Sequence, residues 1–89
     1  MPKMIITHSV VDVDAWLQFK AERADAIRGM GGANAVDHVA HDASNAVAIS
    51  ADVDDVEGVM AALSSPPAEL GSAMERHGVL PPITVYIEK

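Results

Sequence analysis

The sequence predicts an α+β protein with the ferredoxin-like βαββαβ sandwich, a four-stranded antiparallel sheet with helices on one face. Four short segments alternate as β-strands do, and helical segments separate the first from the second and the third from the fourth. Segments 4–10 and 46–51 carry no charge on either face. They are the first and third strands, which this topology places in the centre of the sheet, where both faces are covered.

Length and composition indicate one domain, residues 1–89, with a thin core. A chain of 89 residues buries roughly 60 to 65 per cent of its unfolded surface. Apolar residues make up 49 per cent of the chain, but only Trp16, Phe19 and Tyr86 are aromatic. The core is therefore expected to be mainly aliphatic.

Charge and cysteine content exclude several functional classes. The net charge is −7, and the six basic residues are scattered, whereas nucleic acid and anionic membranes need a concentrated positive field. No cysteine is present, so disulfides, thiolate nucleophiles and thiolate metal sites are excluded. No apolar run approaches the roughly 20 residues of a membrane span, and the start lacks the pattern of a signal peptide. The expected location is the cytoplasm.

The first strand and the first helix follow from the N-terminal third. Residues 4–10 are β-branched and uncharged, with His8 on the same face as Ile6. Asp12 is predicted to cap a helix over residues 13–30. Glycines tolerate the left-handed backbone of a helix end, and three of them, Gly29, Gly31 and Gly32, are expected to end it. One broad side of this helix carries Trp16, Phe19, Lys20, Arg23, Ile27 and Met30.

A hairpin is predicted next. Residues 35–41 alternate as a strand, and Asp37 marks that strand as an edge of the sheet. Residues 42–45 have the composition of a turn. They join the edge strand to the uncharged strand 46–51.

The C-terminal third supplies two helices and a strand. Asp54 and Glu57 have the spacing of a capping box, which predicts a helix that continues to Leu63. A Pro-Pro pair interrupts it, and a short helix is expected to begin there and to end at His77. Residues 83–88 alternate as the last strand.

The helix-free face of the sheet is expected to be too apolar to remain in water. A second copy related by a two-fold axis would cover it, with an interface of about 1,600 Å² or more. The sequence therefore predicts a homodimer, and the alternative is a monomer that leaves this weakly polar face exposed to solvent.

Several motifs resemble one known group. The pattern I-T-H-x-V-x-D-x-D-A-W at 6–16, a turn with Asp42 and Asn45, and L-x-x-x-M-x-x-x-G-V at 70–79 resemble the small dimeric α/β-barrel proteins. Within that superfamily they are similar to bacterial cyclase-like and antibiotic-biosynthesis-monooxygenase-like members. The resemblance implies a ferredoxin-like protomer, a barrel-shaped homodimer, and a cavity between sheet and helices. It implies no single chemistry, because the superfamily includes monooxygenases, isomerases, haem-degrading enzymes and stress-related proteins.

The chain departs from the haem-degrading members it resembles. Those enzymes share an Asn on the first strand, a Trp in the later helical region and a His that ligates haem. Here the first strand offers Thr7 and His8, the only tryptophan is Trp16 on the first helix, and only His77 falls in a helix. Neither haem nor another cofactor is expected.

A metal site is not expected either. His38 and His41 are three residues apart on one strand, so they point to opposite faces. His8 lies on a strand that the predicted sheet order does not place next to that of His38. Imidazole ligands from these residues therefore do not converge on one ion.

His8 is the candidate catalytic residue, because a neutral imidazole on a central strand is suited to act as a general base. Trp16, Tyr86 and His38 are the candidate substrate-binding residues. Trp16 would stack on a planar ligand, and Tyr86 would orient one if the strand register places it on the side of His8. The alternative for each residue is a packing or hydrogen-bonding role without chemistry.

Two functions follow. The first is a cofactor-independent enzyme of the monooxygenase, isomerase or cyclase type that acts on a small apolar organic molecule, with His8 as the base. The second is a non-catalytic dimeric module that binds a hydrophobic metabolite or serves only assembly. No nucleophile motif, phosphate loop or dinucleotide fingerprint is present in the sequence.

Overall fold

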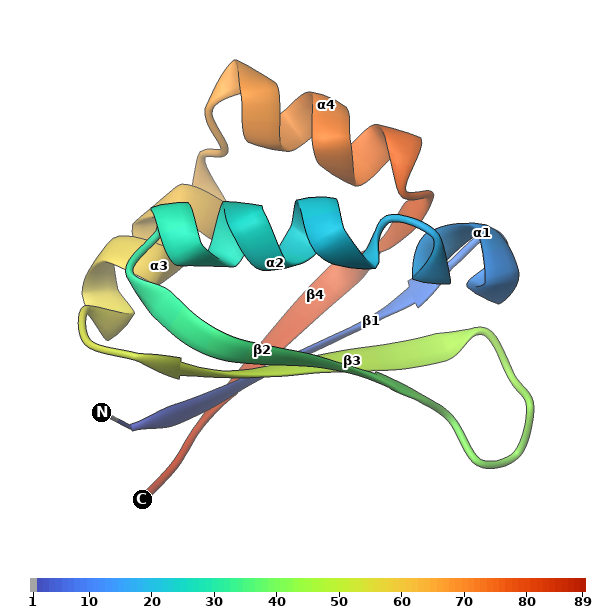
Figure 1. The fold of residues 1–89 in the computed structure, drawn as a ribbon, viewed down its shortest axis with the longest axis horizontal. Helices are drawn as coiled ribbons and strands as arrows, with labels where there is room; N and C mark the ends of the chain where they lie inside the picture. The colour runs from blue at the N-terminus through green and yellow to red at the C-terminus, as the bar shows by residue number, and fades with distance from the viewer. Residues whose placement is uncertain (1) are drawn as a thin grey trace.

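A computed structural model describes residues 2–89, for Glu69 the backbone only, and its secondary structure follows the predicted βαββαβ order with each helical region divided in two (Figure 1). The elements are β1 (Lys3–Val10), α1 (Val13–Leu17), α2 (Lys20–Gly29), β2 (Gly32–Val39), β3 (Ala46–Val53), α3 (Val56–Ser64), α4 (Ala68–Arg76) and β4 (Val79–Ile87). None of the helices in this described range is long and apolar enough to cross a membrane.

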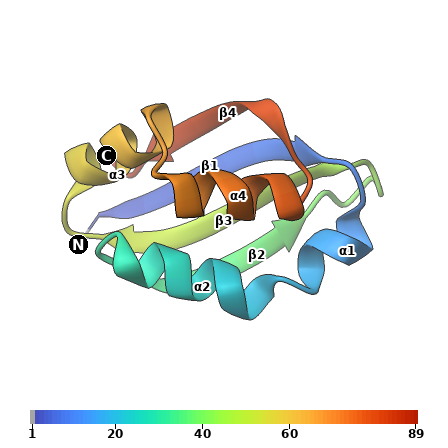
Figure 2. The ribbon, with the colours of Figure 1, turned by 90° about the horizontal axis from the view of Figure 1, so that it is seen from above.

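The four strands form one antiparallel sheet in the order β2-β3-β1-β4. The prediction that the two uncharged strands lie in the centre is confirmed, as is the edge position of β2. All four helices lie on one side of the sheet, and α4 stands further from it than α2 does (Figures 1 and 2).

The core lies between the helices and the sheet. Alternate residues of the two central strands are buried on this side, while their neighbours face the other way. Two clusters meet at Met30, which packs against both. The fully buried side chains of largest volume are Trp16, Met4, Val10, Val53 and Val59.

The sequence predicted one continuous helix over residues 13–30, and this prediction is wrong, because the structure divides the segment into α1 and α2. Asp12 caps α1 as expected, since its carboxylate accepts from the Ala15 N–H at 3.1 Å. The helix then tightens, because the Trp16 carbonyl accepts from the Phe19 N–H at 3.2 Å. The same carbonyl accepts from the side chain of Arg23 at 2.8 Å. This side-chain contact stabilises the break between α1 and α2, and the spacing of apolar residues in the sequence does not predict it.

The other differences concern boundaries. β2 begins at Gly32 and not at 35, and Asn34, with φ 55°, lies where its pairing with β3 shifts register. Gly32 lies so close to Ile27 that a Cβ would stand 2.5 Å from the Ile27 Cγ2. The N-cap of α3 is Asp55, not Asp54, and it accepts from the Gly58 N–H at 3.0 Å.

β4 is longer than predicted and is an edge strand. It begins at Val79, four residues before the expected start, and contains Pro81 and Pro82. Proline has no N–H to donate to a sheet, so an edge strand is the place where it is tolerated. The pairing of β1 with β4 shifts register between Thr7 and Ser9, opposite these prolines.

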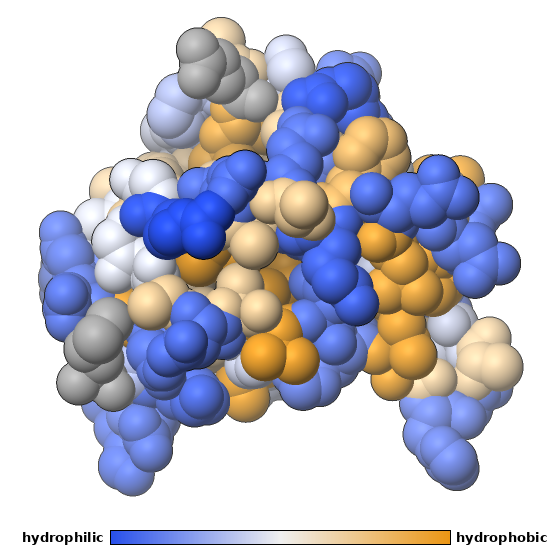
Figure 3. Space-filling view, in the orientation of Figure 1, coloured by the Kyte–Doolittle hydropathy of each residue, from blue (hydrophilic) through white to orange (hydrophobic). Residues whose placement is uncertain are grey.

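The helix-free side of the sheet is hollowed, between the end that holds both chain termini and the end that holds the β2–β3 hairpin (Figures 1 and 3). The strand registers place four exposed apolar side chains on this face: Ile5, Val36, Leu80 and Tyr86. We call it the open sheet face.

Candidate functional site

A small apolar cavity, here the inner cavity, lies between the sheet and the helices. Its volume is about 70 Å³, and all of its lining residues except His8 and Arg23 are apolar. Sites for organic ligands typically measure about 300–1,000 Å³. The inner cavity is therefore too small to enclose an organic substrate without movement of its walls.

His8 lines the inner cavity as a neutral base. It is 9% exposed, and its Nδ1 lies 3.0 Å from the carbonyl oxygen of Ser9. A carbonyl only accepts, so Nδ1 carries the hydrogen and Nε2 keeps its lone pair. Burial lowers the pKa of His8 below 6.5, partly opposed by the Ser9 hydrogen bond and reinforced by the charge of Arg23. At pH 7 the imidazole is uncharged and able to take up a proton at Nε2.

Trp16 forms part of the wall of the inner cavity. It is fully buried, at 0% exposure, and its ring meets that of His8 edge-on with the centroids 6.3 Å apart. The guanidinium carbon of Arg23 lies 3.8 Å from the centroid of the Trp16 ring, a cation–π contact. Nothing in the described part of the structure accepts a hydrogen bond from the indole Nε1. Trp16 thus belongs to the hydrophobic core, lines the inner cavity and packs against the guanidinium of Arg23.

A buried polar cluster, Arg23, Asp37 and His77, adjoins this cavity. Arg23 and Asp37 form a bidentate ion pair, with Nη2 to Oδ2 at 2.8 Å and Nε to Oδ1 at 3.2 Å. Their side chains are only 8% and 4% exposed. The Nη1 of Arg23 lies 3.2 Å from Nδ1 of His77. The cluster therefore connects α2, β2 and the end of α4.

His77 is held in one neutral tautomer. Arginine only donates, so Nδ1 of His77 accepts from Arg23 and Nε2 carries the hydrogen. The Nε2 atom lies 3.6 Å from Oε1 of Glu22, which is beyond hydrogen-bond distance. The ring stacks on Phe19 with the centroids 4.4 Å apart. Burial and the charge of Arg23 lower the pKa of His77, against the opposing effect of Glu22.

Sequence reasoning did not find this cluster. It placed Arg23 on the apolar side of the first helix and took Asp37 only as the sign of an edge strand. The available signal was the pair of anomalies: an arginine among apolar helix positions and a single carboxylate in an otherwise uncharged strand. Only the packing of α2 on β2 brings the two together.

Acid is expected to destabilise the fold through His8 and His77. Both have a pKa lower in the folded state than the usual 6.5, so below pH 6.5 the unfolded chain binds more protons than the native one. The stabilisation is complete above pH 6.5 and is lost as the pH falls towards the native pKa values. Urea unfolding at several pH values between about 7 and about 5 measures this loss.

The control for this prediction is His77→Gln, whose amide oxygen still accepts from Arg23 but does not titrate. The acid-dependent loss of stability should be smaller in this variant than in the wild type. A free energy of unfolding that stays constant over the same pH range would contradict the prediction.

The other two candidate residues lie on the opposite side of the sheet. Tyr86 is 58% exposed and pairs with Ile5, on the open sheet face. His38 is also exposed, with its Nε2 2.9 Å from the hydroxyl of Ser50. The register therefore places neither Tyr86 nor His38 in the inner cavity with His8 and Trp16.

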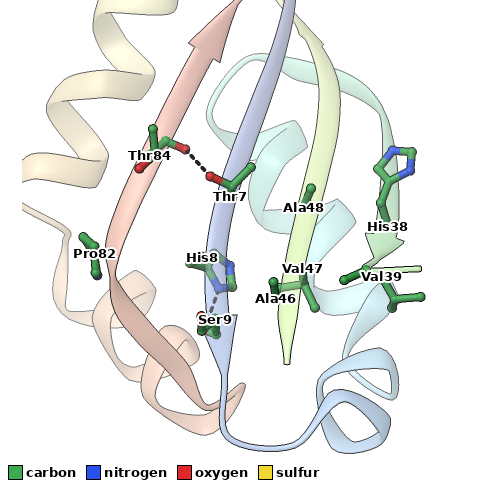
Figure 4. Close-up of a pocket in the computed structure, with 11 residues that line it drawn as sticks. Thr7, His8, Ser9, His38, Val39, Ala46, Val47, Ala48, Pro82 and Thr84 are labelled. Atoms are coloured by element: carbon green, nitrogen blue, oxygen red, sulfur yellow. Dashed lines mark hydrogen bonds between the residues drawn. The ribbon is translucent and has the colours of Figure 1, made fainter. Parts of the chain in front are cut away.

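The open sheet face has a concavity of its own, of about 450 Å³ (Figure 4). Its polar lining consists of Thr7, His8, Ser9, His38 and Thr84, so His8 borders this concavity as well as the inner cavity. Thr7 donates a long hydrogen bond of 3.4 Å to the Thr84 carbonyl. The concavity is shallow and open to solvent. Among the side chains that the structure describes, no three His, Asp or Glu residues are grouped so that they would hold a metal ion.

Comparisons with known proteins show the fold. No protein-family model matches the chain, and no curated protein matches it. The solved structures that resemble it include those of three proteins, each named as a putative antibiotic biosynthesis monooxygenase. They come from Bordetella bronchiseptica, Nitrosomonas europaea and Deinococcus radiodurans.

The likeness extends over nearly the whole of each chain. For the Bordetella protein the TM-score is 0.66 at 17% identity, covering 99% of this chain and 94% of that one. For the Nitrosomonas protein the TM-score is 0.59 at 18% identity, covering 100% of this chain and 97% of that one. For the Deinococcus protein the TM-score is 0.57 at 17% identity, covering 97% of this chain and 90% of that one. The ferredoxin-like fold predicted from the sequence, and the resemblance to monooxygenase-like proteins as a likeness of fold, are confirmed.

Proposed function

We propose that the chain is a cofactor-independent enzyme that acts on a small apolar organic molecule, with His8 as the general base. The observation that carries the proposal is the state of His8, a buried, neutral imidazole with a free Nε2 at an apolar cavity. A base of this kind removes a proton from an acidic C–H or O–H group of the substrate. The apolar walls and Trp16 would hold the substrate and exclude water.

The reaction type follows from what happens to the resulting anion. Return of the proton to another atom gives an isomerase, and attack of the anion on a second group of the same molecule gives a cyclase. In a monooxygenase the oxidant is O₂: a CH₂ group and O₂ together give a carbonyl group and water. The names of the three solved structures support the monooxygenase type for this chain.

Replacing His8 with alanine tests the proposal directly. Once a substrate has been found by screening aromatic and enolisable compounds, His8→Ala should lower kcat by about 10²-fold or more, because the base is lost. The matched control is His41→Ala, at an exposed position outside the inner cavity. Unchanged turnover in His8→Ala would remove His8 from the mechanism.

We also propose that the protein is a homodimer joined through the open sheet face. Its exposed apolar side chains and its concave shape support this assembly. The partner sheet would bury Tyr86 and His38 in the interface, which gives these two residues a role separate from the inner cavity.

A non-catalytic dimeric module is the second candidate. The small volume of the inner cavity, about 70 Å³, favours it. In that case organic compounds would not be turned over by the wild-type protein or by His8→Ala.

A further inference from the structure

A groove runs along the outer side of the helical layer. It has a volume of about 710 Å³ and lies between α2, α3 and α4. Most of its lining is small and apolar, so the three helices leave space between them. The small lining residues are Ala26, Gly29, Ala62, Pro67, Ala68 and Ala73.

The outer groove and the inner cavity share part of their walls. Three side chains line both spaces: Ala26, Met30 and Leu70. All three are half-buried, as expected for a thin partition with one side towards each space. Met30 is unbranched and adaptable, and Leu70 lies in the first turn of α4, the helix that stands away from the sheet (Figure 1).

We infer that Met30 and Leu70 form a gate between the outer groove and the inner cavity, and that the ligand is an elongated apolar molecule that occupies both. This inference rests on the proposed function, which places the reacting end of the ligand at His8. The inner cavity alone, at about 70 Å³, does not hold an organic molecule, whereas the groove falls within the range typical of ligand sites. With the gate side chains displaced, the two spaces join.

The polar groups of the groove support an uncharged ligand. Glu22 and Arg76 line it, but they form an ion pair with each other at 2.6 Å between Nη2 and Oε1. Each charge is therefore already compensated. Apart from Ser72, the residues left to contact the ligand are apolar, which suits a flat or chain-like hydrocarbon body.

The single tryptophan makes this inference measurable. Trp16 lines the inner cavity and is fully buried, so its fluorescence, excited at a wavelength that spares Tyr86, responds to molecules that reach the cavity. The ligand probe is N-phenyl-1-naphthylamine, a neutral, flat and elongated molecule whose own emission rises in apolar sites. Acrylamide, a small neutral quencher, probes access through the gate.

Three variants alter the partition. Ala26→Phe places a ring in it and should weaken binding of the naphthylamine about tenfold, the scale of a steric change in an apolar site. Met30→Ala and Leu70→Ala open the gate and should each raise the acrylamide quenching constant of Trp16 severalfold. The matched control is Met60→Ala, a partly exposed methionine on α3 that lines neither space, and it should change neither quantity.

The outcomes separate this inference from the proposed function. Quenching of Trp16 by the naphthylamine that is equal in the wild type and all three variants overturns the gate, and leaves the inner site standing. Probe emission without any quenching of Trp16 overturns both. If naphthylamine binding and acrylamide quenching change in the gate variants as expected but turnover is unaffected by His8→Ala, the gate is supported and His8 is not the catalytic base. Far-ultraviolet circular dichroism checks folding, and if Met30→Ala is unfolded, Leu70→Ala and Ala26→Phe decide.

Discussion

Asp37→Ala is expected to lower the free energy of unfolding by about 3–5 kcal/mol, because it leaves the Arg23 guanidinium buried without its partner. Both side chains of this pair are more than nine-tenths buried, and Asp37 accepts two of the hydrogen bonds that Arg23 donates. Small domains have a total stability of about 5–15 kcal/mol, so the loss is a large share of it. Urea unfolding followed by the fluorescence of Trp16 measures the change.

Two further variants show whether the unpaired charge is the cause. The double variant Arg23→Met, Asp37→Leu removes both charges and should recover much of the lost stability, since apolar replacements of a buried ion pair are often neutral. Ala21→Ser, at an exposed position on the same helix, should stay within about 0.5 kcal/mol of the wild type. A loss below about 1 kcal/mol in Asp37→Ala would contradict a structural role for the pair.

Thr7→Glu is expected to weaken the proposed dimer by roughly a thousandfold, or about 4 kcal/mol. Thr7 lies at the middle of the open sheet face, paired with Ala48 on one side and with Thr84 on the other. A two-fold axis would bury two copies of the new carboxylate. Sedimentation at micromolar concentration should give a dimer for the wild type, twice the 9.3 kDa of one chain, and a monomer for the variant.

The controls for this experiment separate charge from shape. Thr7→Val keeps the size of the side chain without the charge, and it should remain dimeric. Ala21→Glu adds the same charge on the helical side, away from the proposed interface, and should also remain dimeric. A wild-type protein that sediments as a single copy would remove the barrel-shaped dimer from the account of this chain.

The order of the strands was predictable because it depends on which residues alternate. Alternation identifies four strands and their order along the chain, and the βαββαβ topology places the first and third of them, segments 4–10 and 46–51, in the centre of the sheet. The absence of charge on both faces of these two segments agrees with that position. The break in the first helix was not predictable in this way. It depends on the Arg23 side chain that donates to the Trp16 carbonyl, a contact that only the packed structure creates.

The candidate site was predictable only in part. His8 and Trp16 are a histidine and a tryptophan in a chain with few aromatic residues, so composition alone draws attention to them. That Tyr86 faces away from His8 follows from the pairing register of β4, where the prolines accompany a shift. The Arg23–Asp37 pair joins residues 14 apart on different elements, and no local pattern encodes it.

The two adjacent prolines on β4 also affect how copies of the chain associate. An exposed strand edge offers N–H groups to any passing extended segment, which is how sheets grow from molecule to molecule into fibrils. At Pro81 and Pro82 the backbone has no such group to offer. Edge-to-edge growth from the β4 side would therefore stall at these two residues, whereas the proposed dimer joins two sheets face to face, an association that is complete at two copies.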